Sequence, residues 1–229
     1  MRTAVYVDGF NLYHSALESR PEMKWLDLKA FATAVLPPNH TVVAVKYFTA
    51  RVKGQDGSGG PQRQDTYVRA LEQHIGGFEV HWGKFTERPK WRRLVEAPTC
   101  IDPPMKHARI LQRDEKGSDV SLAAHMVNDA WADLYDCAAV ITNDTDQCGA
   151  LKLVRKLEKK ATLLSTVNLT KRMPDTLNDE ERSVPKSLRE CVDHVRYFTL
   201  KHLAISQLPE RVPHRSNGRF YLRPHAWSV

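Results

Sequence analysis

Acidic and amide side chains follow two short apolar runs that lie far apart in the sequence. Asp8 and Asn11 come at the end of the first run, and Asp144 and Asp146 come at the end of the second. A further acid, Asp119, stands at the start of an amphipathic segment that precedes the second run. Ligands of open parallel sheets bind outside the carboxyl ends of the strands. If the two runs are parallel strands of one sheet, these acids are expected at the same edge.

A cluster of carboxylates is suited to a divalent metal ion. Crowded carboxylates raise one another's pKa unless a cation neutralises them. Hard oxygen ligands with no Cys/His set beside them favour Mg²⁺ or Mn²⁺ over zinc. Such an ion would orient a phosphodiester and lower the pKa of an attacking water. The predicted metal ligands are Asp8, Asp119, Asp144 and Asp146, and Asn11 joins them as a predicted catalytic residue that holds the substrate or a metal-bound water.

Each of these residues also has a purely structural interpretation. Asp8 and Gly9 could form a turn, and Asp119 could stabilise a helix N-terminus that Ser118 caps. Asp144 could belong to an ordinary loop. Their joint placement at the ends of predicted strands favours a functional site over separate structural roles.

The elements that must position this cluster alternate between strand and helix. Such an alternation predicts an α/β fold with a mostly parallel central sheet and helices on both faces. Residues 86–114 are predicted to be irregular, and residues 170–189 are predicted to form a loop. Strands are predicted at 4–7, 42–49, 78–85, 138–142 and 161–167, and helices at 12–34 with an interruption near Pro21, 64–74, 119–134 and 147–159.

Length and composition favour a globular protein that does not enter a membrane. The chain has 229 residues, of which 41% are hydrophobic and 27% charged, as expected for a domain with a full core. No apolar stretch approaches the length of a membrane span, and the first residues lack the apolar run of a signal peptide. The four cysteines are widely separated and show no metal-binding spacing. A cytoplasmic protein with reduced thiols and no membrane partner is therefore expected.

An excess of basic residues favours a polyanionic partner. The formal net charge is +7, and the sequence pI is about 9.3. Basic surroundings for an acidic centre suit a substrate with a phosphate backbone, so a nucleic acid is the expected partner. Tyr67 either stacks on a base or belongs to the core. The predicted nucleic-acid contacts are Lys116, Ser118, Arg63, Tyr67 and Arg69.

Three segments of the chain together resemble the NYN-domain family, a PIN-like nuclease group. They are Val-Asp-Gly-Phe-Asn-Leu at 7–12, Glu-Lys-Gly-Ser-Asp-Val at 115–120 and Ile-Thr-Asn-Asp-Thr-Asp at 141–146. Their order, their spacing and the strand–helix pattern agree with the family over residues 1–168. The resemblance implies that these residues form the catalytic domain, with residues 169–229 as a C-terminal extension packed on the same domain.

The resemblance carries further implications for fold and function. It implies a PIN-like three-layer α/β/α fold and ribonuclease chemistry that depends on a divalent metal ion. Functional acids are expected at Asp8, Asp119 and Asp144, with Asp146 and Asn11 beside them. PIN-like folds often self-associate, so a homodimer is also an expectation.

Some positions depart from the pattern of that family. Many members carry Ser-Gly-Asp where this chain has Thr142-Asn143-Asp144, and often an aromatic residue where it has Gln147. His125 stands where many members have another acid. The central acids are retained, so metal affinity and substrate choice are the properties that these changes would alter.

The leading hypothesis from the sequence is an endoribonuclease that hydrolyses RNA through metal-activated water. The alternative is an RNA-binding or regulatory protein with the same fold and little turnover, which RNA affinity without cleavage would favour. A third hypothesis is a phosphatase with Asp8 as its nucleophile. That chemistry usually needs a second acid two residues later, where this chain has Phe10.

Overall fold

The computed structural model describes residues 1–52, 59–96, 106–165, 184–216 and 218–228. The strands are β1 (Arg2–Asp8), β2 (Thr41–Ala50), β3 (Phe78–Arg93), β4 (His107–Lys116), β5 (Cys137–Ile141), β6 (Lys160–Ser165), β7 (His194–Tyr197), β8 (Arg211–Pro213) and β9 (Phe220–Leu222). The α-helices are α1 (Gly9–Leu12), α2 (Leu28–Val35), α3 (Gly60–His74), α4 (Ser118–Trp131), α5 (Cys148–Lys156), α6 (Lys186–Glu190) and α7 (Leu200–Ile205). Single turns are η1 (Tyr13–Leu17), η2 (Pro21–Met23), η3 (Thr145–Gln147) and η5 (His225–Trp227).

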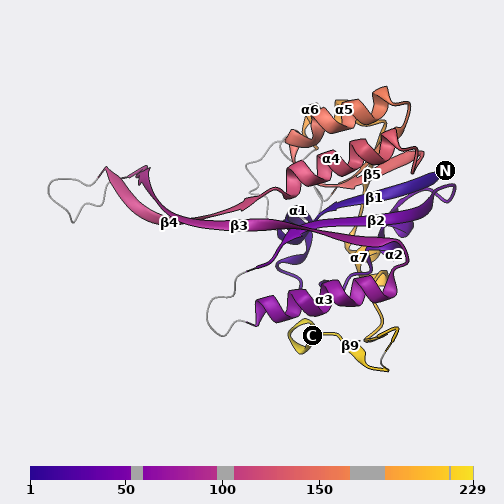
Figure 1. The fold of residues 1–229 in the computed structure, drawn as a ribbon, viewed down its shortest axis with the longest axis horizontal. Helices are drawn as coiled ribbons and strands as arrows, with labels where there is room; N and C mark the ends of the chain where they lie inside the picture. The colour runs from indigo at the N-terminus through magenta and orange to yellow at the C-terminus, as the bar shows by residue number, and fades with distance from the viewer. Residues whose placement is uncertain (53–58, 97–105, 166–183, 217, 229) are drawn as a thin grey trace.

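A seven-stranded sheet in the order β4-β3-β2-β1-β5-β6-β7 forms the centre of the fold. Every neighbouring pair is parallel except β3 and β4. Helices α4, α5 and α6 lie on one side of the sheet, and α2, α3 and α7 lie on the other (Figure 1). The predicted α/β fold with a mostly parallel sheet and helices on both faces is therefore confirmed.

The strand order reverses direction beside β1. The chain moves from β1 outward to β2 and β3, and later returns to place β5 on the other side of β1. The register pairs Val7 of β1 with Ile141 of β5, so the two strands end at the same level. Ligands of open parallel sheets bind where the strand order switches in this way. Asp8 and the loop after β5 both lie at this switch point.

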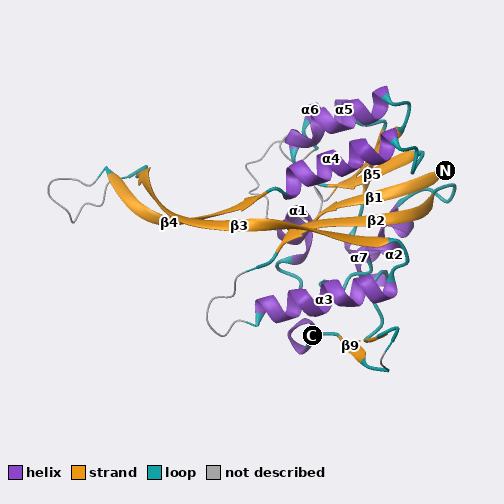
Figure 2. Ribbon diagram, in the orientation of Figure 1, coloured by secondary structure: helices purple, strands orange, loops and turns teal. Residues whose placement is uncertain are grey.

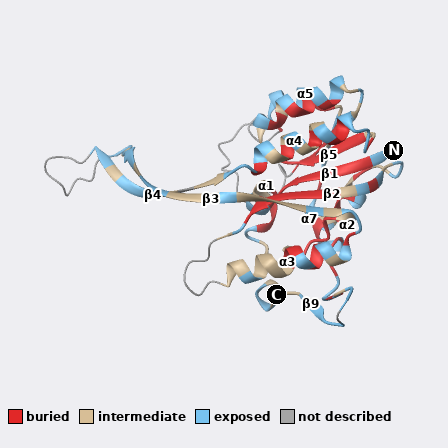
Figure 3. Cartoon of the chain, in the orientation of Figure 1, coloured by how far each residue is buried: buried red, intermediate tan, exposed pale blue. Residues whose placement is uncertain are grey.

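The two faces of the sheet bury separate hydrophobic cores, as the alternation of side chains along β1 shows. Val5 and Val7 belong to the core under α2 and α3, whereas Ala4 and Tyr6 belong to the core under α4 and α5. Because helices cover both faces, the central strands are buried almost throughout (Figure 3). The strand ends are consequently fixed by buried contacts on two sides.

The described residues after 183 complete this sheet and core. β7 pairs in parallel with β6 as the outermost strand. Phe198 packs edge-to-face on Phe31 of α2, with ring centroids 4.7 Å apart, and Leu203 and Leu208 are buried in the same core. The short β8–β9 hairpin follows and leads into η5 beside α3 (Figure 1).

Residues 86–93 and 107–114 correct the prediction of an irregular segment at 86–114, of which residues 97–105 lie outside the described residues. β3 continues to Arg93 and pairs with β4 in an antiparallel hairpin that projects from the body of the molecule (Figure 2). Beyond Gly83, β3 no longer pairs with β2, and most of its residues from Arg88 to Arg93 are exposed. Charged residues and Pro89 are tolerated on such a strand, and they hide the alternation by which strands are usually recognised.

The segment predicted to be helical at 12–34, with an interruption near Pro21, also differs from the structure. It contains the short turns η1 and η2, and only α2 forms a helix of two turns. Asp27 caps α2 by accepting the main-chain N–H groups of Lys29 and Ala30. Most of the loop predicted at 170–189 lies outside the described residues. Among the described residues, no helix has the length and apolar character that a bilayer crossing requires.

Candidate functional site

Asp8 occupies the carboxyl end of β1 and caps the first turn of α1. One side-chain oxygen accepts the main-chain N–H of Asn11 at 3.0 Å, and the other accepts the hydroxyl of Thr142 at 3.0 Å. Only 8% of the residue is exposed. The adjacent Gly9 lets α1 approach β2, because a Cβ atom there would lie 2.8 Å from the carbonyl oxygen of Phe48. The sequence therefore folds so that a carboxylate is fixed at the switch point.

The environment of Asp8 disfavours its charged form. Burial raises the pKa of Asp8 to about 6, although the two hydrogen bonds that it accepts oppose the shift. The nearby carboxylates of Asp119 and Asp144 raise this pKa further. Three acids from separate elements thus interact electrostatically at this position.

The loop after β5 forms the second side of the site. The main-chain N–H of Asp144 donates to the hydroxyl oxygen of Thr142 at 3.1 Å, so this hydroxyl bridges Asp144 and Asp8. The carboxylate of Asp144 in turn caps η3 by accepting the N–H of Asp146 at 3.0 Å. Asp146 itself is exposed and lies outside the cavity described below.

The start of α4 forms the third side. Gly117 adopts a left-handed conformation, with φ of 99°, that turns the chain from β4 into α4. A side-chain oxygen of Glu115 accepts the main-chain N–H of Ser118 at 3.3 Å. Burial raises the pKa of Asp119, and Asp144 and Glu115 raise it further. Glu115 was not predicted as a site residue, although it belongs to the same sequence segment as Asp119.

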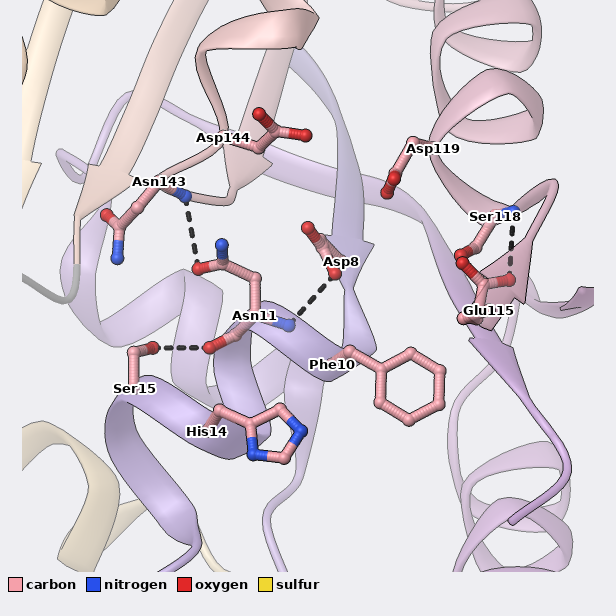
Figure 4. A pocket seen from close by; sticks show the side chains of 10 residues that line it. All are labelled: Asp8, Phe10, Asn11, His14, Ser15, Glu115, Ser118, Asp119, Asn143 and Asp144. Atoms are coloured by element: carbon pink, nitrogen blue, oxygen red, sulfur yellow. Dashed lines mark hydrogen bonds between the residues drawn. The ribbon is translucent and has the colours of Figure 1, made fainter. Parts of the chain in front are cut away.

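These acids line one open cavity of about 640 Å³, termed here the acid pocket. Asp8, Asp119 and Asp144 converge on a common space from β1, α4 and the β5 loop (Figure 4). The structure therefore brings together three of the four predicted metal ligands. The lining residues are Asp8, Phe10, Asn11, His14, Ser15, Glu115, Ser118, Asp119, Asn143 and Asp144.

The donor atoms of the acid pocket have the chemistry of a hard-cation site, but they are not assembled as one. Among the described residues, no group of three or more His, Cys, Asp or Glu side chains is placed to hold a metal ion. Binding of Mg²⁺ or Mn²⁺ would require these carboxylates to move closer together. It therefore stays a prediction.

The residues predicted to contact nucleic acid do not form one surface. Tyr67 is buried and donates its hydroxyl to the carbonyl oxygen of Leu26 at 2.8 Å, so its ring belongs to the core and is no exposed stacking platform. Arg69 pairs with Asp65 of the same helix at 2.7 Å. Ser118 is buried in the acid pocket, and Lys116 is exposed at the end of β4. Arg63 lies elsewhere, in the wall of a second cavity.

This second cavity, termed here the aromatic chamber, has a volume of about 440 Å³. It lies between α1, η1, β2 and α3, and Phe85 of β3 and Trp227 of η5 complete its wall. Phe10 and His14 line both the chamber and the acid pocket, so the two cavities are neighbours. No sequence pattern indicates this cavity, because its aromatic residues come from distant segments. They are Phe10, Tyr13, Tyr47, Tyr67, Phe85 and Trp227.

One known protein whose sequence is similar to this chain is named as a monooxygenase. No protein-family model matches the sequence. The chain is 28% identical to 6-hydroxy-3-succinoylpyridine 3-monooxygenase HspA of Pseudomonas putida, in a match that covers 99% of this chain and 75% of that protein. A crystal structure of a protein of unknown function from Vibrio parahaemolyticus covers 86% of this chain and 93% of its own, with 18% identity and a TM-score of 0.46. The latter likeness is too weak to inform either fold family or function.

The predicted ribonuclease function is wrong, because the curated relative is named as a monooxygenase. The predicted hydrolase class is wrong for the same reason. Because the relative is named as an enzyme, the alternative of a binding protein with little turnover is also disfavoured. The physical reason is that carboxylates at a sheet edge and a basic surface serve many chemistries, so neither is specific for phosphodiester cleavage. The resemblance to the NYN-domain family, RNA as a partner and a homodimer are tested by none of these comparisons and stay predictions.

Proposed function

We propose that this protein is an oxidoreductase that inserts oxygen into a small hydroxylated aromatic compound containing ring nitrogen. The observation that carries the proposal is the similarity to a monooxygenase over 99% of the chain. The name of that relative specifies a hydroxypyridine with a succinoyl group as its substrate. A match of this extent includes the elements that build both the acid pocket and the aromatic chamber.

The arrangement of the two cavities supports a substrate of this class. Ligand cavities of about 300 Å³ or more accommodate small molecules, and the aromatic chamber, at about 440 Å³, is large enough for a single-ring compound. The neighbouring acid pocket offers the carboxylates of Asp8, Asp119 and Asp144. A ring in the chamber that directs its hydroxyl group past Phe10 and His14 would meet these carboxylates.

Carboxylates in that position would activate the ring toward oxygen. Accepting the proton of the ring hydroxyl leaves a phenolate-like oxygen, which raises the electron density at the ring carbons next to it and opposite to it. In the hydroxylation of a ring C–H, one atom of dioxygen becomes the new hydroxyl group and the other leaves as water. The two electrons come from an external reductant of the reduced-nicotinamide class. The chain's own contribution is to orient the ring and accept the proton.

A flavin or nicotinamide dinucleotide does not fit the switch point in the usual way. No Gly-x-Gly-x-x-Gly sequence occurs in the chain. The N-terminus of the helix after β1, where a pyrophosphate would bind, is already capped by the carboxylate of Asp8. The adjacent acids would repel a phosphate group. We therefore assign no redox cofactor to the acid pocket.

The test is oxygen uptake by the purified protein with 6-hydroxypyridine-3-carboxylate and related hydroxypyridines. Each compound is supplied with NADH or NADPH, with and without added flavin and Mn²⁺. The expected result is substrate-dependent uptake, with heavy oxygen from labelled dioxygen recovered in the product. Asp8→Asn should abolish it, whereas the surface control Asp65→Asn should not. Absence of substrate-dependent uptake under every condition would refute the proposal.

A further inference from the structure

We infer that the aromatic chamber binds a planar aromatic acid, with its ring against the aromatic wall that includes Tyr67 and Trp227 and its carboxylate held by Lys24 and Arg63. This inference rests on the proposed function, for which it defines the substrate class and the orientation of the substrate. All of these residues line the same cavity.

The walls form an apolar slot of aromatic rings. The rings of Tyr67 and Trp227 meet edge-to-face with centroids 5.9 Å apart, and those of Tyr47 and Tyr67 do so at 6.5 Å. The hydroxyl of Tyr67 is already used by its bond to a main-chain carbonyl, so this residue offers its ring. Burial raises the pKa of Tyr47 to about 12, which keeps its hydroxyl protonated. A flat ring gains from such surroundings through both area and edge-to-face geometry.

Two cations in the wall have no carboxylate partner among the described residues. The ammonium group of Lys24 lies 3.2 Å from the hydroxyl of Tyr13 and 4.9 Å from the centre of that ring. Arg63 is half-buried in the first turn of α3, a turn that contains no acidic residue. Partly buried charges without a counter-ion are unfavourable, and a bound carboxylate would supply one. The chamber therefore favours an anionic aromatic ligand over a neutral one.

The charges on either side of Phe10 and His14 set the direction of the ligand. Lys24 and Arg63 lie in the chamber, whereas the carboxylates lie in the acid pocket. A ligand carboxylate would be repelled by those acids and attracted by the two cations. The ring hydroxyl, whose proton the acids can accept, then faces the acid pocket.

The C-terminal segment closes the chamber and gives Trp227 its position. The guanidinium of Arg223 donates to the carbonyl oxygens of Glu22 at 2.6 Å and Trp227 at 2.7 Å, and it pairs with Glu210 at 2.9 Å. The ring of Trp227 also packs on Trp25, with centroids 6.2 Å apart. Arg223 is thus a positioning residue, and Trp227 is the wall that it holds.

The inference is tested by calorimetric binding of three probes, of which one carries both the ring and the charge, one lacks the charge and one lacks the ring. They are 6-hydroxypyridine-3-carboxylate, the corresponding carboxamide and succinate. Wild-type protein should bind the aromatic acid at least about 10-fold more tightly than the amide, because charge-assisted hydrogen bonds are stronger than neutral ones. Succinate, which lacks a ring, should bind weakly. Equal affinity for the acid and the amide, or no binding of any probe, would overturn the inference.

Variants separate the two parts of the site. Lys24→Met and Arg63→Met should each reduce the preference for the acid over the amide. Trp227→Ala should lower the affinity for both aromatic probes. Lys152→Met, which replaces an exposed cation on the opposite side of the sheet, is the matched control. Unfolding temperatures confirm that each variant folds. Unchanged selectivity in both Lys24→Met and Arg63→Met would contradict the assignment of the cations.

The same variants distinguish this inference from the proposed function. Selective binding of the aromatic acid without oxygen uptake would support the chamber and refute the oxidoreductase assignment. Oxygen uptake with a KM for the acid substrate that neither cation variant changes would support the oxidoreductase and refute the chamber. An increase in KM of about 10-fold with little change in kcat supports both.

Discussion

The main-chain N–H of Asn143 donates to the side-chain Oδ1 of Asn11 at 3.1 Å, which joins the loop after β5 to the first turn after β1. The two residues are far apart in the sequence but lie at the ends of neighbouring strands. Asn11 was predicted to hold substrate or a metal-bound water. The structure shows that its side-chain amide oxygen already fixes the loop that carries Asp144.

Removing this contact should loosen the loop without unfolding the protein. Asn11→Ala deletes one hydrogen bond, so a loss of about 1 kcal/mol in unfolding free energy is expected. Amide exchange of Asn143 should become faster, and substrate-dependent oxygen uptake should fall through misplacement of Asp144. The exposed Asn128→Ala on α4 serves as the control. Unchanged exchange at Asn143 would show that the contact does not hold the loop.

Asp8 should make the protein less stable as pH rises. Its pKa is about 6 in the folded protein against an ordinary value of 3.8, so the folded state binds the proton more tightly than the unfolded state does. The unfolding free energy therefore falls as pH rises from about 3.8 through about 6, and the loss is complete above that range. A shift of this size corresponds to about 3 kcal/mol.

Asp8→Asn should consequently be more stable than the wild type at pH 8, with a difference that shrinks toward pH 4. Urea unfolding at a series of pH values measures this dependence. Asp65→Asn, on the surface of α3, controls for the general loss of an acid. A pH-independent difference between Asp8→Asn and the wild type would rule out the raised pKa as its cause. Stability gained by removing a site residue is expected where function requires an unfavourable charge.

The sheet and most of the acid pocket could be predicted because their sequence signals are local. β1 and β5 are apolar runs that end in polar residues, and parallel pairing alone brings Asp8 and Asp144 to one edge. Asp146 could not be excluded in this way. Whether its side chain follows Asp144 depends on η3, a turn whose geometry is fixed by the cap that Asp144 provides.

The aromatic chamber could not be predicted because it depends on tertiary packing. Tyr47, Tyr67 and Trp227 come from β2, α3 and η5, and each by itself has the sequence pattern of a core residue. The nuclease prediction failed for a related reason. Acids at the edge of a parallel sheet are compatible with many chemistries, so their pattern in the sequence does not identify the reaction.

Divalent cations should stabilise the protein by relieving the repulsion in the acid pocket. Asp8 and Asp119 each have a raised pKa to which other acids contribute, and a bound Mn²⁺ would offset that repulsion. Millimolar Mn²⁺ should raise the unfolding temperature of the wild type at pH 7.5 by a few degrees, an effect of the size expected from ligand binding at about 1–2 kcal/mol. The effect should be lost in Asp119→Asn and Asp144→Asn. An equal rise in these variants would place the cation elsewhere.

A buried ion pair behind the site should stabilise the folded protein only when both of its members are present. Lys46 of β2 and Asp129 of α4 have side chains that are 9% and 4% exposed, and their charged atoms lie 2.7 Å apart. The hydroxyl of Tyr6 donates to the same oxygen of Asp129 at 2.7 Å. Burial raises the pKa of Tyr6, so this hydroxyl stays a donor. The three residues tie β1, β2 and α4 together beneath the elements that carry Asp8 and Asp119.

Asp129→Asn should leave Lys46 as a buried charge and lower the unfolding free energy by about 3 kcal/mol. Lys46→Met should also be costly, because it leaves the carboxylate of Asp129 without its cation. The double variant Lys46→Met/Asp129→Asn removes both charges and keeps an acceptor for Tyr6, so it should be more stable than either single variant. Chemical denaturation of the four proteins gives the coupling energy. Additive losses would mean that Glu79, 3.5 Å from Lys46, already compensates its charge.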